Sequence, residues 1–513
     1  MTISVIQDWQ PKPGDRFVRL RRAKAYPLKR ALGVLGLFSA GYGDVGSSIY
    51  YALGLVVSIA YGAAPVALLV AGIFYVFTSL SYAEGTAMLP EAGGAASFAR
   101  KGFNDFWALI AGWALIFSYV ITMAISAYTV PAYLKYFWSW LREPGADVIF
   151  AIAIVSSLMC LNIVGVKKST LLNISFVVLD ILTQVIIVAL AMLFLFDAQA
   201  LFHNITAYWP SVPDFIFGIA VAAIAYTGIE SISQLSEEAR QPRLSVPRAY
   251  ILTMAVVLIL FCGISVAGFS TMTPLEMASQ WARDPLAGIA HGLSTSIVPD
   301  EVAARLFSDP LAIGIAAETL NGLLRILPAL VAILASTILI VATNAGLMGI
   351  SRLTFSLGRF QLVPLFLSKV HPRFSTPYRS IVLFASIAIL FLLPGFFTTD
   401  IFSKLGGLYA FGSLLAFAFA HASIIRLRIK SPTQPRPFKI RGNIRLGGHE
   451  LPLTAILGLI ATGAIWIIVL IMHPYARWVG LGWLAVGVGG YSLFRHRKHL
   501  PFMQMAREIK VSN

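Results

Sequence analysis

GYGDVGSS, residues 41–48, places three glycines, two serines and one carboxylate within eight positions. The stretch lies inside an apolar segment, 32–60, that is long enough to cross a bilayer core about 30 Å thick. Each interior glycine costs a helix about 1 kcal/mol, so this span is predicted to break halfway across the membrane. Non-helical backbone at that depth is tolerated only where it lines a cavity or packs within protein.

The same residues match the G-x-G-x-x-G pattern of dinucleotide-binding loops. That interpretation requires a preceding strand and a soluble βαβ unit, and a membrane span provides neither, so it is rejected. Close helix packing through small residues is the simpler alternative. We favour a broken helix that forms a site, because Asp44 belongs to the same run and intramembrane carboxylates mark ion or substrate paths.

The composition predicts an all-α polytopic membrane protein. Of the 513 residues, 58% are hydrophobic and only 12% are charged. Twelve transmembrane helices are expected, at 32–60, 65–89, 106–133, 149–166, 170–196, 215–236, 250–271, 327–349, 381–397, 405–425, 453–472 and 478–494.

The basic residues orient these helices. Of the 39 Lys and Arg residues, 32 fall in the two terminal segments and every second loop, and seven fall in the remaining loops. Cytoplasmic loops hold the positive charge, so both termini are predicted to be cytoplasmic in a multi-pass inner-membrane protein. The net charge of +16 then reflects topology and attraction to anionic lipids, and no nucleic-acid partner is expected. The sequence indicates no oligomeric state.

We expect four regions along the chain. They are a cytoplasmic N-terminal segment (1–31), a ten-helix core (32–426), a cytoplasmic loop with peripheral helices eleven and twelve (427–495) and a cytoplasmic tail (496–513). The outer connection at 273–322 is predicted to form short amphipathic helices. Cys160 and Cys262 lie inside apolar spans and are predicted to be small buried hydrophobes.

A second interruption follows in span six, where Tyr226-Thr227-Gly228-Ile229 precedes Glu230. Spans one and six occupy corresponding positions of two five-helix halves and enter from opposite faces, which predicts inverted repeats at 32–197 and 213–426. Glycine-interrupted spans at matching positions of two halves are typical of a transporter site. The chain has no P-loop, metal-ligand cluster or nucleophile–base arrangement, so we expect neither an enzyme nor a cofactor nor a resident metal.

Four further acidic residues have interpretations of their own. Asp180, midway along span five, has a coupling role or a structural one. Glu84, near the inner end of span two, is interpreted as a snorkelling or helix-packing residue. Glu237 and Glu238 lie at the inner boundary beside basic residues, where a gating or surface ion pair explains them.

Several collinear motifs resemble the amino acid–polyamine–organocation (APC) superfamily of transporters. They are GSSIY (46–50), YAE (82–84) with PEAGG (90–94), NIVGVK (162–167), EEARQP (237–242), GR (358–359) and RPFK (436–439). The resemblance implies a leucine-transporter-like 5+5 inverted repeat with broken helices one and six, working by alternating access.

The resemblance also implies roles for individual residues. Backbone amides at Gly46, Ser47 and Ser48 would receive a substrate carboxylate at a half-helix N-terminus. The predicted substrate-binding residues are Gly43, Gly46, Ser47, Ser48, Tyr51, Ala225, Tyr226, Thr227 and Gly228. The predicted ion-coupling residues are Asp44, Asp180 and Glu230.

The chain departs from the superfamily pattern at three places. Asp180 stands where many amino acid permeases carry Lys, and Phe360-Gln361 replaces Asp-Gly in a loop signature. Asp44 would repel a substrate carboxylate by about 1 kcal/mol at 4 Å in water, and by more at lower dielectric. The segment 42–53 also resembles the first helix of Kup-type potassium transporters, which implies a monovalent cation at Asp44 and Tyr51.

The leading hypothesis is therefore a cation-coupled symporter for an amino acid or amine, with a proton as the expected coupling ion. The alternative is proton-coupled potassium uptake. A membrane nutrient sensor on the same scaffold, which binds without transporting, is a minor alternative.

Overall fold

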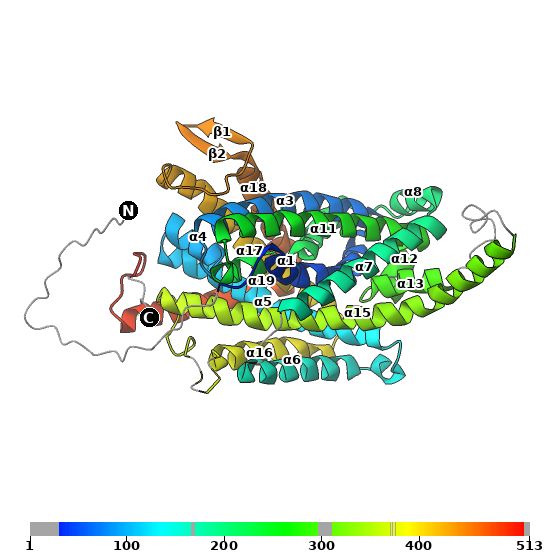
Figure 1. Ribbon diagram of the computed structural model, residues 1–513. Helices are drawn as coiled ribbons and strands as arrows, with labels where there is room; N and C mark the ends of the chain where they lie inside the picture. Colours follow the sequence, from blue (N-terminus) through cyan, green and yellow to red (C-terminus); the bar gives the residue numbers. More distant parts are fainter. Residues whose placement is uncertain are drawn as a thin grey trace, which may run out of the picture.

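The computed structural model is a bundle of long helices with one small β-hairpin at one end (Figure 1). It describes residues 30–165, 170–295, 310–369, 371, 373–374 and 376–506. Most of the predicted segment 1–31, the basic pair Lys167 and Lys168, and part of the connection 273–322 lie outside the described residues. So do residues 507–513 of the predicted tail.

Ten helices of the described residues are long and apolar enough to cross a membrane. The longest, Val34–Met88, covers the first two predicted spans and contains α1 (Val34–Val45), η1 (Gly46–Ser48), α2 (Ile49–Ala60), η2 (Tyr61–Ala63) and α3 (Ala64–Met88). Helix α19 (Pro474–Arg497) covers the residues of the twelfth predicted span, but it is not one of the ten helices. The helical, polytopic class is confirmed, whereas the count of twelve and the inverted repeat stay predictions.

The other elements follow in chain order. They are α4 (Ala95–Gly102), α5 (Asp105–Leu134), η3 (Ser139–Arg142), α6 (Ala146–Val164), α7 (Thr170–Phe194), α8 (Ala198–Ala207), α9 (Val212–Ala222), η4 (Ala223–Tyr226), α10 (Ser231–Gln234), η5 (Ser236–Glu238), α11 (Pro242–Thr271), α12 (Pro274–Gln280), α13 (Pro285–Thr295), α15 (Pro310–Arg359), α16 (Tyr378–Leu392), η6 (Leu393–Phe396), α17 (Ile401–Lys430), β1 (Asn443–Leu446), β2 (His449–Pro452) and α18 (Leu453–Met472). Short helices α12 and α13 do form in the connection after α11, as predicted. The antiparallel hairpin β1–β2 was not predicted.

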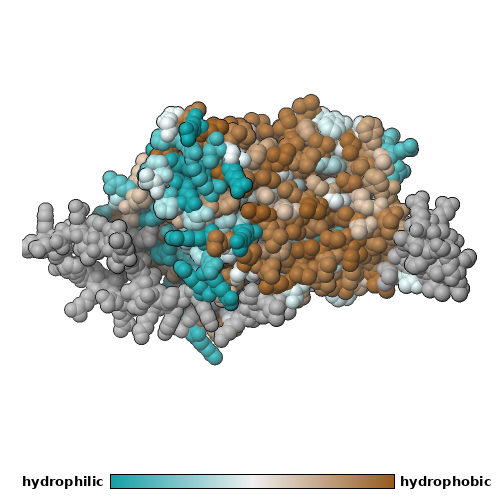
Figure 2. Space-filling model, turned by 45° about the horizontal axis from the view of Figure 1, so that its top comes forward, coloured by the Kyte–Doolittle hydropathy of each residue, from teal (hydrophilic) through white to brown (hydrophobic). Residues whose placement is uncertain are grey.

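Helix α5 occupies the centre of the bundle. Its most apolar stretch is 89% buried, against 17% in α6 and 28% in α18. Helix α5 packs against α15 and α17, so those helices share the core while α6 and α18 lie at the edge. Figure 2 shows the resulting exterior as a broad hydrophobic belt with hydrophilic residues gathered at its ends. Together with ten helices of sufficient length to cross a bilayer, a hydrophobic belt of this extent fits a membrane protein.

The two cysteines lie on this exterior. Cys160 of α6 and Cys262 of α11 are both exposed, so the prediction that they are buried is wrong. The physical reason is that a transmembrane helix is apolar on its lipid-facing side as well as its protein-facing side, so hydrophobicity alone does not separate the two.

One end of the bundle is held by a buried carboxylate on α3. Glu84 accepts hydrogen bonds from Arg428 of α17 at 2.7 and 2.6 Å and from the backbone N–H of Ile440 at 2.9 Å. Arg436 lies 3.4 Å from the same carboxylate. The YAE and RPFK segments therefore meet at one ion cluster. Glu84 is a helix-packing residue, and the snorkelling interpretation is wrong because its side chain does not reach water.

A second buried carboxylate holds the end of the chain. Asp105, at the start of α5, pairs with Arg100 at 2.9 Å and with Arg495 of α19. The backbone of Ala506 donates to Asp105 at 2.7 Å and accepts from Arg100 at 2.6 Å. The described part of the tail is thus fastened to the start of α5 through both backbone groups of one residue.

Replacing Glu84 by Gln should lower the free energy of unfolding by about 3–5 kcal/mol, because it leaves Arg428 buried without its counter-charge. Thermal unfolding in detergent measures this. Glu450→Gln is the matched control, since Glu450 pairs with Lys439 at the surface, where ion pairs contribute little. Equal midpoints for the two variants would contradict the prediction.

Candidate functional site

Span one is tightened at its glycine-rich run rather than unwound. The backbone at Val45, Gly46 and Ser48 keeps right-handed helical dihedral angles, and residues Gly46–Ser48 form the 3-10 turn η1. The Ser47 hydroxyl donates to the carbonyl of Asp44 at 2.7 Å and so satisfies a group at the turn. The prediction of a broken helix one is wrong in this conformation, because the small residues permit a tighter helical turn that needs no extended backbone.

The break predicted in span six is present. Helix α9 ends at Ala222, η4 follows, and the chain is extended at Thr227 (ψ 158°). Gly228 has φ 104°, a conformation that side chains with a Cβ rarely adopt. The helix resumes as the four-residue α10. The carboxylate of Glu230 accepts from the Gly228 N–H at 3.0 Å and caps one of the freed backbone groups.

Asp44 packs directly against this break. A Cβ added to Gly228 would lie 2.8 Å from the Asp44 Cγ and 2.9 Å from the Val45 nitrogen, so only glycine fits between the two spans. Ser231, at the start of α10, donates a hydrogen bond to Asp44 Oδ2. Sequence reasoning missed Ser231, although its position beside Glu230 in the polar interruption was a signal.

Asp44 and Glu230 form a pair of buried acids. Their relative exposures are 1% and 0%, and they lie close enough for their charges to interact. Asp44 Oδ1 and Glu230 Oε1 have no hydrogen-bond partner within the described residues. No Lys, Arg or His of the described ranges forms an ion pair with either acid. Two buried carboxyl groups without a counter-charge are stabilised either by protonation of one of them or by a cation placed between them.

Ser48 ends the tightened turn, and Tyr51 follows it in the first turn of α2. Their hydroxyls share a hydrogen bond at 3.1 Å, and the Tyr51 ring packs edge-on against Phe402 of α17. No hydrogen bond joins Tyr51 to Asp44 in the described part of the chain. Their joint role as ligands of a monovalent cation stays a prediction.

The remaining predicted substrate-binding residues surround the break. Tyr226 points toward α3 and α11, where its hydroxyl donates to the Leu68 carbonyl at 2.9 Å and its ring stacks on Tyr75. Ala225 and Thr227 are buried beside it. Gly43 packs near Val341 of α15. The Tyr226 side chain thus forms a wall behind the break rather than a contact with Asp44.

Asp180 of α7 belongs to a separate polar cluster. Its carboxylate accepts from Tyr42 at 3.0 Å, from Tyr50 at 2.6 Å and from Gln184 at 2.8 Å. Tyr42 and Tyr50 flank the tightened turn and are eight residues apart, which places them near one face of a helix. Asp180 therefore attaches both parts of span one, α1 through Tyr42 and α2 through Tyr50, to α7. Sequence reasoning named Asp180 but gave the two tyrosines no role at it.

The inner-boundary acids pair with α15 and not with their neighbours in sequence. Glu238 lies 2.6 Å from Arg352, and Glu237 lies 3.5 Å from Arg359. A backbone bridge joins Leu32, just before α1, to Ala239. These contacts close the bundle at the end that the basic residues predict to be cytoplasmic.

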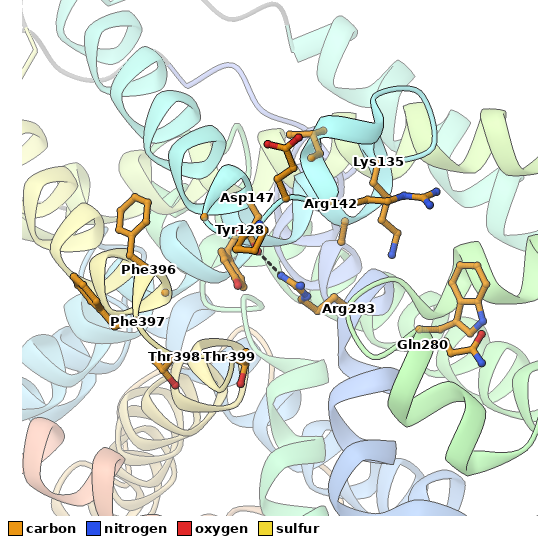
Figure 3. Close-up of a pocket in the computed structure, with 17 residues that line it drawn as sticks. Tyr128, Lys135, Arg142, Asp147, Gln280, Arg283, Phe396, Phe397, Thr398 and Thr399 are labelled. Atoms are coloured by element: carbon orange, nitrogen blue, oxygen red, sulfur yellow. Dashed lines mark hydrogen bonds and ion pairs between the residues drawn. The ribbon is translucent and has the colours of Figure 1, made fainter.

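The opposite end contains a cavity of about 740 Å³ (Figure 3). It is lined by the ends of α5 and α6 and by the connection between α12 and α13, and by none of the predicted site residues. Arg283 reaches Asp147 across it at 2.7 Å, and the neighbouring Asp284 pairs with Lys135 at 2.8 Å. Burial raises the pKa of the Asp284 carboxyl above its ordinary value, although Lys135 opposes this shift.

The comparison with known families settles what kind of protein this is. A model of the family described as "Amino acid permease" matches residues 32–481. The chain belongs to this family. The permease is accordingly a membrane transporter of the APC superfamily and not an enzyme, as the motifs predicted.

Relatives of the permease differ in the cargo that their names specify. A branched-chain amino acid permease of Bacillus subtilis is 28% identical over 81% of this chain and 84% of its own. A methylthioribose transporter of the same organism is 26% identical over 93% and 96%. A low-affinity putrescine importer of Escherichia coli is 23% identical over 86% and 88%. Family membership therefore leaves the substrate to be argued from the site.

Gly228→Ala should abolish transport by the permease, because the new methyl group would displace Asp44 in addition to straining a backbone at φ 104°. Gly442→Ala is the control for strain alone, since Gly442 has φ 76° and a Cβ added there would meet no atom within 4 Å. Uptake and thermal stability are measured on both. If the two variants transport equally, the close approach to Asp44 has no functional weight.

Proposed function

We propose that this permease is a proton-coupled secondary transporter of amines or amino acids that works by alternating access. The observation that carries the proposal is the pair Asp44 and Glu230 at the break in span six, each with a free carboxylate oxygen and neither paired with a basic residue among those described. Two like charges repel by roughly 4 kcal/mol at about 4 Å in a dielectric of about 20. A proton on one acid, or an ammonium group between the two, removes that repulsion.

The site supports the amino group of the cargo more strongly than its carboxylate. The N–H of Gly46 is bonded to the Tyr42 carbonyl, so in this conformation it is committed to the helix. A carboxylate at Gly46, Ser47 and Ser48 would require the tightened turn to open, and it would face Asp44. We therefore place an amine at Asp44 and infer that the chain takes cationic amines at least as well as zwitterions.

The wider architecture is proposed on the same basis. We infer twelve transmembrane helices in a leucine-transporter-like 5+5 repeat, in the inner membrane, with both termini cytoplasmic. The ion pairs of Glu237 and Glu238 with α15 would form the inner gate, and the cavity at the opposite end is consistent with a conformation closed toward the cytoplasm.

Asp44→Asn should reduce uptake of labelled putrescine or leucine into proteoliposomes by about 10- to 100-fold, because a charge-assisted bond contributes about 1.5–3 kcal/mol. Asp214→Asn is the matched control, since this exposed aspartate lies in the first turn of α9 in the same span six, where it accepts a hydrogen bond from the N-cap Ser211 at 2.6 Å. Unchanged pH-dependent uptake in Asp44→Asn would remove Asp44 from the mechanism.

The same assay distinguishes the alternative functions. Potassium uptake without putrescine or leucine uptake would replace the proposal by potassium transport, for which the carboxylates and hydroxyls of the site are also suitable ligands. Saturable binding without flux of any of the three would indicate a sensor.

Asp180→Asn should weaken uptake in the same direction and to a smaller extent. An amide at this position keeps one acceptor oxygen for the three donors from Tyr42, Tyr50 and Gln184, so the arms of span one are held less firmly. Initial uptake rates over a range of external pH measure the effect. A loss larger than that of Asp44→Asn would make Asp180 the principal coupling site.

A further inference from the structure

One face of α3 carries four buried hydroxyls that complete no hydrogen bond of good geometry in the described residues: Tyr75, Ser79, Tyr82 and Thr86. Their spacing of four, three and four residues places them in one stripe along the helix. Their relative exposures are 3%, 1%, 0% and 0%. The Tyr75 hydroxyl lies near that of Ser79. A buried hydroxyl without a partner loses its bonds to water and gains nothing, so such groups are rare and call for an explanation.

Other hydroxyls of the same helix behave differently. Thr78 and Ser81 lie off the stripe, and both bond to the ring of His421, at 3.2 and 2.9 Å. Thr78 also donates to the carbonyl of Phe74 at 3.0 Å. Within α3, the hydroxyls that complete no hydrogen bond are therefore those of the stripe.

The stripe begins beside Glu230. Tyr75, Tyr82 and Tyr250 all lie close enough to Glu230 for its charge to act on their hydroxyls. The rings of Tyr82 and Tyr250 are 6.3 Å apart, and the Tyr250 hydroxyl, which completes no hydrogen bond of good geometry among the described atoms, lies near the hydroxyls of Thr86 and Ser233. The other ionisable groups near Glu230 are Asp44 and the hydroxyls of Tyr119 and Tyr409.

The stripe ends at the predicted cytoplasmic end of α3. Thr86 lies two residues before the helix terminus, and the following loop folds onto the restarted span six. In that loop a Cβ on Gly94 would lie 2.6 Å from the Ser233 hydroxyl and 3.3 Å from the Gln234 side-chain nitrogen. Both polar atoms of Gln234 and one oxygen of Glu91 are again buried without a partner in the described chain.

We propose that this stripe, with Tyr250 and Gln234, is a proton path between Glu230 and the cytoplasmic end of the bundle. The proposal rests on proton coupling as the proposed function, and it adds the route by which the proton would reach or leave Glu230. A hydroxyl can both accept and donate a hydrogen bond, and single water molecules bridge such groups in polar protein interiors. A proton leaving the Glu230 carboxylic acid passes to the first acceptor of the path, each member hands one on, and a water at the inner surface receives the last. Glu230 is left as a carboxylate.

The path is tested first without any cargo. In purified protein the infrared band of the Glu230 carboxyl is identified by its loss in Glu230→Gln, and its response to a pH jump is timed. Removing one hydroxyl at a time in Tyr82→Phe, Tyr250→Phe and Ser79→Ala should slow the response by about tenfold or more, as expected when a positioned proton-transfer group is lost. Ser81→Ala, on the same helix but off the stripe, should respond at the wild-type rate.

Uptake measurements then distinguish the proposed proton path from the proton coupling of transport. In proteoliposomes the stripe variants should lose putrescine or leucine uptake driven by a pH gradient while keeping exchange of labelled for unlabelled cargo at equal pH. Equal infrared rates in the stripe variants and Ser81→Ala, or absence of a titrating Glu230 band, would overturn the path. A third outcome separates the two proposals. If wild-type uptake does not depend on pH, while the stripe variants still protonate Glu230 more slowly than Ser81→Ala in the infrared experiment, the proposed proton coupling is overturned and the route of protonation stands.

Discussion

The polar backbone that span six exposes at Thr227 and Gly228 is the constraint on which the rest of the centre depends. In lipid each unsatisfied backbone group costs several kcal/mol, so a break at this depth must be matched by polar partners from neighbouring helices. Glu230 folds back onto the Gly228 N–H, and Asp44 packs against the same glycine and binds Ser231. The two buried carboxylates thus lie at the helix break, and Glu230 binds one of its freed backbone N–H groups.

The two glycine-containing interruptions, in spans one and six, have different backbone conformations. Span six opens fully, whereas span one tightens into a 3-10 turn whose flanking tyrosines are held by Asp180. At the end predicted to be cytoplasmic, the same spans are joined to α15 and to each other through the Glu238–Arg352 ion pair and the Leu32–Ala239 bridge. A transporter that opens toward this end would have to break these contacts. The hydrogen bonds of Asp180 to Tyr42 and Tyr50 would meanwhile keep both α1 and α2 attached to α7.

The class of the protein and the break in span six were predictable from the sequence because glycines and acids inside apolar spans have few physical interpretations. Asp44 and the break at Gly228 were found in this way. Side-chain direction was not predictable, since Tyr226 faces α3 and Cys160 faces outward, and periodic polarity is missing from spans surrounded by lipid. The unwinding expected at Gly46 was wrong because glycine permits both an extended backbone and a tighter helix, and only packing against neighbours selects between them.

The fastening of Ala506 to Asp105 has a consequence for how the protein is made. The carboxylate and the backbone it holds are 401 residues apart, and Arg495 is 390 residues from the same acid. A ribosome delivers the chain from its N-terminus, so Asp105 is inserted long before two of its partners exist. The contacts around Asp105 can therefore be completed only after residue 506 has left the ribosome, and before then Arg100 is the one of these partners already synthesised.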